Sequence, residues 1–115
     1  MTTPTIDQAV LDELKVTTGA EFAMELVDTF LEEAPIMLQD LEASMAASDA
    51  DRFRRAAHSL KSNSNTFGAT ALATEARRLE LAGLASVIAG GAQPLAPLNA
   101  EYVRVAAALQ ALRDA

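Results

Sequence analysis

Apolar side chains recur every three or four residues along most of the chain, and this spacing constrains the fold more than any other feature. Such spacing places apolar groups on one face of an α-helix. No stretch shows the strict alternation of apolar and polar residues that marks a half-buried strand. Glycine and proline are few, 5 and 4 among 115 residues, and lie mostly between the periodic stretches. The pattern predicts an all-α fold.

Two helices are expected in the first half of the chain. A capping-box pattern at residues 5–8 predicts a short helix to about Lys15, and a second such pattern at residues 18–21 opens a long one after a break at residues 17–19. Pro35 lies inside the long helix and removes one backbone donor, so we expect a kink or a split there. The predicted inner face of this helix consists of Phe22, Leu26, Phe30, Ala34, Leu38, Leu41 and Met45.

Three more helices are expected over about residues 49–66, over about 70–87, and from Pro94 or Pro97 to about residue 112. Gly68 suits the left-handed position that closes a helix. The predicted inner faces of the last two helices are Leu72, Ala76, Leu79 and Gly83, and Leu98, Tyr102, Val105, Leu109 and Leu112. Together the five helices predict an antiparallel up-and-down four-helix bundle with an extra short N-terminal helix. A chain of 115 residues is one domain's worth, so residues 1–115 are expected to form a single domain.

The composition excludes several classes of function. Cysteine is absent, which removes disulfides, thiolate catalysis and cysteine-ligated metals, and a single histidine cannot build a multi-histidine metal site. The net charge of −7 argues against binding nucleic acid or anionic membranes. The sequence shows neither a signal-peptide pattern nor an apolar stretch of about 18 residues, so a cytoplasmic location is the default expectation.

The third expected helix carries the chemistry. Advancing about 100° per residue places six side chains within about 60° of one direction, namely Phe53, Ala56, Ala57, Leu60, Ser64 and Phe67, which form the predicted buried face. His58, the single histidine, falls about 140° away on the polar face. Arg54 and Lys61 lie one turn to either side of it, with Ser62 and Asn65 nearby.

These neighbours favour a nucleophilic imidazole. Adjacent cations disfavour a third positive charge, so they keep the ring neutral, and they stabilise phosphoryl oxygens. The small serines around His58 leave room for another protein to approach the ring. The site therefore suits an exposed phosphoryl acceptor. The alternative is a solvated surface histidine, and composition and helical geometry alone favour that alternative.

The segment from Ala57 to Ala69 resembles the signature of histidine-containing phosphotransfer (HPt) domains. That pattern has a histidine, a lysine three residues later, a small residue next, and a glycine ten residues after the histidine. His58, Lys61, Ser62 and Gly68 fill these positions, although the family commonly has glycine where this chain has Ser62. The resemblance covers about residues 20–85 well, and the last helix only by length and pattern.

The resemblance implies a phosphocarrier of multistep phosphorelays. His58 would accept a phosphoryl group on Nε2 from a receiver-domain aspartate and pass it to another receiver, with Lys61 contacting the phosphoryl oxygens. The expected partners are response-regulator receiver domains, namely the receiver of a hybrid histidine kinase and a downstream regulator, and the receiver would supply Mg²⁺, so no cofactor of this chain's own is expected. The residues expected to border the partner are Arg54, Arg55, Ser62, Asn65 and Gly68.

Charge is divided unevenly along the chain. Residues 1–51 hold 12 acidic side chains and one basic side chain, a net −11, whereas residues 52–115 hold 8 basic and 4 acidic, a net +4. Because the receiver pocket is acidic by family likeness, a positive surface around His58 is the expected complement. Arg77 and Arg78 are equally well explained as a solvated face.

Two alternative functions stay open. One is a helical interaction module without transfer activity, and the other is the phospho-accepting domain of a chemotaxis-type histidine kinase. The sequence has no glycine-rich nucleotide loop and no room for an ATP-binding domain beside the bundle, so we do not expect it to phosphorylate itself. A monomer is the default expectation.

Overall fold

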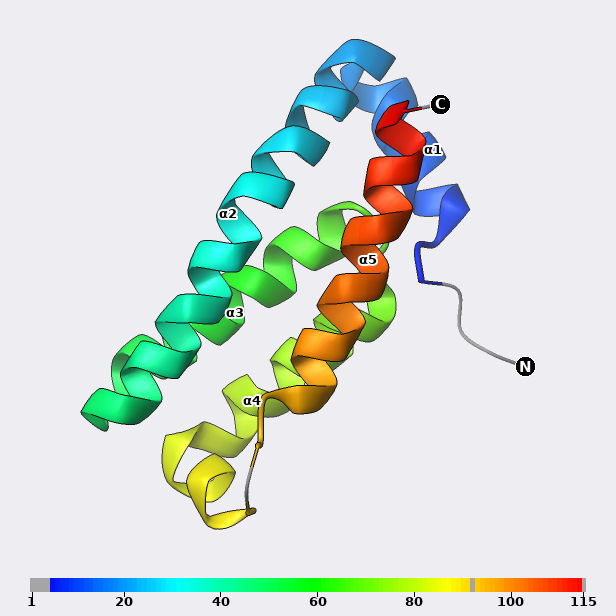
Figure 1. Ribbon diagram of the computed structural model, residues 1–115. Coiled ribbons are helices and arrows are strands. Elements are labelled where there is room, and N and C mark those ends of the chain that lie inside the picture. The colour runs from blue at the N-terminus through cyan, green and yellow to red at the C-terminus, as the bar shows by residue number, and fades with distance from the viewer. Residues whose placement is uncertain (1–4, 92, 115) are drawn as a thin grey trace.

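The computed structural model describes residues 5–91 and 93–114, and within these ranges the chain forms helices and no strand (Figure 1). The helices are α1 (Gln8–Thr18), α2 (Ala20–Ala47), α3 (Ala50–Thr66), α4 (Thr70–Ala89) and α5 (Ala96–Asp114). The prediction of an all-α fold is confirmed. None of the described helices combines the length and the apolar character that a membrane crossing requires.

The helix pair α3 and α4 is the most extensively packed unit of the bundle, and α2 lies along α3 on its other side (Figure 1). The last helix, α5, packs against α4 and α2. The short helix α1 packs against α2 and α3. The element that carries the histidine is therefore supported by three neighbouring helices.

The ends of α1 differ from the prediction. Asp7, not Thr5, is the N-cap, and its carboxylate accepts a hydrogen bond from the Ala9 amide at 3.1 Å. The helix continues to Thr18, whose hydroxyl donates to the Leu14 carbonyl at 2.8 Å and so does not cap α2. The break is confined to Gly19, which has a φ of +90° that a side chain would strain.

The long helix α2 is continuous through Pro35, so of the two predicted outcomes, a kink or a split, the split does not occur. A proline inside a helix costs about 3 kcal/mol, because a backbone hydrogen bond is lost and the ring crowds the preceding turn. Phe30 and Ala34 before the proline and Leu41 after it are all buried, and this packing holds both halves of the helix against the core.

At the start of α2, the buried face is rotated about the helix axis relative to the predicted inner face. Phe22 is 49% exposed, and Ala23 and Val27 are buried in its place. Each step of four residues turns about 40° beyond a full turn, so a run of such steps drifts around the helix. Phe30 lies on the buried face. Phe22 precedes it by two steps of four residues and therefore points about 80° away from that face.

The buried face predicted for α3 is confirmed at all six positions, including Ser64, whose hydroxyl donates to the Leu60 carbonyl at 2.6 Å. The Phe67 ring packs on Phe30 with their centroids 5.3 Å apart. These contacts fix the rotation of α3 about its axis and thereby the direction of its polar face.

The helices of the second half follow the predicted bounds closely, with one difference. Gly83 was predicted on the inner face of α4, but its φ of +79° and ψ of 158° break the helix there. In α5, Pro97 lies in the first turn, Leu98, Val105 and Leu109 are buried, and the remaining predicted positions are partly buried.

Candidate functional site

His58 lies on the exposed face of α3, as the helical geometry predicted, and its side chain is 59% exposed. Its Nδ1 atom lies 2.7 Å from Oε2 of Glu80 on α4. An ionised carboxylate only accepts hydrogen bonds, so we place the imidazole hydrogen on Nδ1. Nε2 then keeps its lone pair and is the nucleophilic atom of the ring.

Glu80 holds the second member of the site as well. Its Oε1 atom accepts a hydrogen bond from Lys61 Nζ at 3.0 Å, and the Glu80 side chain is only 15% exposed. The hydrogen bond from Lys61, aided by the one with His58, lowers the pKa of Glu80 below its ordinary value, although burial acts in the opposite direction. The carboxylate is therefore ionised at neutral pH and fixes both side chains.

The sequence reasoning did not assign a role to Glu80. The signal that points to it is the turn that joins α3 and α4, since residues at similar distances before and after a tight helical turn meet across it. His58 is ten residues before Gly68 and Glu80 is twelve residues after it. Lys61 and Glu80 contact each other across the same pair of helices.

Gly68 makes this turn possible and lies away from the ring. Its φ of +72° confirms the predicted left-handed position. A Cβ atom there would lie 2.7 Å from the Asp7 carbonyl oxygen, and the Asp7 amide donates to the Gly68 carbonyl at 2.8 Å. Ten residues of helix separate Gly68 from His58 by about 15 Å. Its place is therefore under the start of α1, and the structure does not bring it to the imidazole.

The two arginines before His58 are engaged with a neighbouring acid. Arg54 and Arg55 contact the Asp51 carboxylate at 2.9 and 3.0 Å. The Arg54 hydrogen bond, followed by the charge of Arg55, lowers the pKa of Asp51. Arg52 reaches across to Asp40 of α2 at 2.6 Å.

Two hollows flank the histidine. One, of about 370 Å³, lies between α2 and α3 and includes Arg55, Ala56 and Ser59. The other, of about 140 Å³, lies between α3 and α4 and includes Lys61 and Asn65. Ser62, between them in sequence, is exposed.

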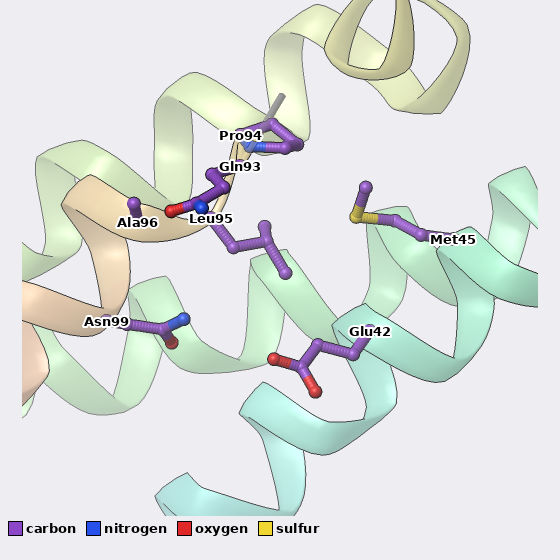
Figure 2. Close-up of a pocket in the computed structure, with 7 residues that line it drawn as sticks. All are labelled: Glu42, Met45, Gln93, Pro94, Leu95, Ala96 and Asn99. Atoms are coloured by element: carbon purple, nitrogen blue, oxygen red, sulfur yellow. The ribbon is translucent and has the colours of Figure 1, made fainter. Parts of the chain in front are cut away.

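A larger cavity of about 540 Å³ lies elsewhere, between the end of α2 and the start of α5 (Figure 2). Figure 2 shows Leu95 pointing from the start of α5 toward the side of the cavity where Glu42 and Met45 lie. No residue of α3 lines this cavity, so it adds nothing to the histidine site. Within residues 5–91 and 93–114, no group of three or more histidine, cysteine or acidic side chains is placed to hold a metal ion.

The fold and the site define a class, that of helical bundles carrying one nucleophilic surface histidine. The family model described as "Hpt domain" matches residues 25–115, and the chain belongs to this family. The match extends through the last helix, beyond the segment that the motif covers.

A solved structure supports the assignment. The crystal structure of histidine-containing phosphotransfer protein B (HptB) from Pseudomonas aeruginosa PAO1 is similar, with a TM-score of 0.83 and 28% sequence identity. The alignment covers 98% of this chain and 97% of that chain. A comparison with curated proteins gave no match. The family and this neighbour support a histidine phosphocarrier of a phosphorelay.

Proposed function

We propose that His58 accepts a phosphoryl group from the phospho-aspartate of one receiver domain and passes it to the aspartate of another. The observation that carries the proposal is the fixed imidazole. Glu80 binds Nδ1 at 2.7 Å and leaves Nε2 free on an exposed surface. Family membership and the likeness to HptB support the same carrier role.

The transfer needs no separate acid or base. The Nε2 lone pair attacks phosphorus, the bond between phosphorus and the aspartate oxygen breaks, and the aspartate leaves as a carboxylate. The phosphorylated ring then carries a positive charge shared with Nδ1–H, which faces the Glu80 carboxylate. Glu80 is thus a positioning residue that stabilises charge developing on the ring. The second transfer is the same step in reverse.

In this proposal Lys61 contacts the phosphoryl oxygens. Its Nζ is anchored on Glu80, one helical turn from His58, and its side chain is 23% exposed. Movement away from Glu80 toward a phosphoryl group requires rotation of a flexible side chain only. The receiver supplies Mg²⁺ and the acidic pocket, and this chain contributes position and charge.

The receiver surface in this proposal surrounds the histidine. Arg55 borders the hollow between α2 and α3, Asn65 borders the hollow between α3 and α4, and exposed Ser62 and Arg54 lie on the polar face of α3. Gly68 acts indirectly, through the turn. The proposal includes a single domain, a cytoplasmic monomer and receivers of a hybrid kinase and a downstream regulator. It also includes an antiparallel up-and-down order of the four long helices, which the course of the ribbon in Figure 1 supports.

The test uses two phosphoryl donors. Phosphoramidate, a small donor, phosphorylates a free imidazole with cleavage of its P–N bond and release of ammonia, and a phosphorylated receiver tests the biological reaction. Both should place an acid-labile, base-stable phosphate on the wild type and none on His58→Gln. Label that persists in the variant overturns the assignment. Label from phosphoramidate but from no receiver indicates an interaction module in place of a carrier.

A further inference from the structure

The positive charge of the second half of the chain is mostly neutralised within the fold. Of its eight basic side chains, seven form ion pairs with carboxylates of the described residues. Arg77 on α4 is exposed and forms no ion pair within residues 5–91 and 93–114. Its charge is therefore available to a partner.

Arg77 lies at the hollow between α3 and α4. This α3–α4 hollow measures about 140 Å³ and is lined by Lys61, Asn65, Thr70, Ala73, Thr74 and Arg77. No carboxylate lines it, and the nearby Lys61–Glu80 pair is neutral as a unit. The hollow has one uncompensated positive charge with polar amide and hydroxyl groups beside it, which suits a single carboxylate.

The phosphoryl group itself is not the occupant that the geometry favours. Nδ1 of His58 faces Glu80 on α4, so Nε2, across the ring, is turned away from α4. A phosphoryl group on Nε2 therefore points away from the helix that carries Arg77. An anion in the α3–α4 hollow comes instead from the protein docked over His58.

We infer that the α3–α4 hollow receives an acidic side chain of the docked receiver domain, with Arg77 as its ionic partner. This inference rests on the proposed function, since it takes a receiver as the partner. Arg77 then determines which receivers dock productively, because a receiver with a basic or apolar residue at that position lacks the pair. Arg54 and Arg55 share Asp51, so together they contribute less to this selection than two unpaired arginines would.

The experiment compares Arg77→Glu with Arg78→Glu. Arg78 is the matched control because it is the next residue, is also exposed, and pairs with Glu75 at 3.1 Å outside the α3–α4 hollow. Purified receiver domains of the source organism are first screened against the wild type labelled with phosphoramidate, and the one that unloads it fastest is the probe. The readout is the second-order rate of transfer to that receiver, divided by the rate of phosphoramidate labelling of the same variant.

We expect Arg77→Glu to lower this ratio about tenfold at low salt, and Arg78→Glu to lower it less than about twofold. The difference should shrink strongly between about 50 mM and about 500 mM salt, where exposed charges are screened. A receiver in which one acidic residue is replaced by a basic one should restore transfer from Arg77→Glu, and the residue that does so is the partner carboxylate. Equal ratios for the two variants overturn this inference alone, whereas a wild type that no receiver unloads overturns the proposed function and the inference with it.

Discussion

Replacing Glu80 by glutamine tests the role that the structure gives to this carboxylate. The substitution keeps the size of the side chain and an oxygen that can accept from Nδ1, but it removes the negative charge beside the ring. A unit charge pair at about 4 Å is worth about 4 kcal/mol at an effective dielectric constant near 20. His58 is 59% exposed, and water screens the pair, so about 1 to 1.4 kcal/mol of transition-state stabilisation remains. We therefore expect labelling by phosphoramidate to slow roughly five- to tenfold.

The assay measures the initial rate of acid-labile phosphate incorporation at pH 7, with circular dichroism on each variant to verify the helical fold. Glu75→Gln is the matched control, because Glu75 lies on the same helix and, among the described residues, pairs with Arg78 alone. The slowing should persist in a Lys61→Ala background, since it acts through the imidazole. If Glu80→Gln and Glu75→Gln react at the same rate, the carboxylate does not stabilise the phosphorylated ring and the reasoning is refuted.

Three further predictions concern transfer and stability. Lys61→Ala should keep the helical signal and slow transfer from a receiver; loss of the helical signal would make Lys61 structural instead. Gly68→Ala should lower the free energy of unfolding by about 2–4 kcal/mol in urea titrations, because the position has a positive φ and a Cβ there meets the Asp7 carbonyl, whereas Gly90→Ala, at an ordinary helical φ, should change it by less than about 1 kcal/mol. The pKa of Glu80 is lowered on folding, chiefly by the hydrogen bond from Lys61, so its contacts with Lys61 and His58 stabilise the fold above its ordinary pKa of 4.5, and this contribution is lost as pH falls through the lower folded pKa. The stability gap between wild type and Glu80→Gln should therefore be largest near neutral pH and close in acid; a constant gap contradicts the charge of Glu80 as its origin.

Local periodicity was sufficient to predict α3. Its apolar residues span only four turns and combine steps of three and four, so they stay on one face of the helix. Because His58 lies about 140° from that face, its exposure could be predicted as well. In α2 the same reasoning failed at Phe22, because repeated steps of four drift away from the inner face. The predicted cap at Thr18 is wrong for another local reason: its hydroxyl donates to the Leu14 carbonyl of α1 and does not accept from an amide of α2.

The candidate site was only partly predictable, because Glu80 joins it through a contact between two helices. His58 and Lys61 are one turn apart on a single helix, and spacing alone places them together. Glu80 is 22 residues from His58 and meets it only because the turn at Gly68 folds α4 back along α3. The partners of the arginines likewise depend on which acids the fold brings near.

Charge counting illustrates the same limit and leads to the strongest expectation about the partner. The net +4 of residues 52–115 predicts a broadly positive surface around His58. In the fold, Asp40, Asp51 and Glu80 set three negative charges against the four cations of α3, so the count overstates the field that a receiver meets. What attracts a partner is then the position of the uncompensated charge and not the total. One such charge remains on Arg54 and Arg55, which share Asp51. The other is Arg77, which forms no ion pair within the described residues and lies one helical turn from Glu80. We therefore expect a receiver to be distinguished by whether it offers an acid to the α3–α4 hollow, while the proposed reaction at Nε2 is the same for every receiver that docks.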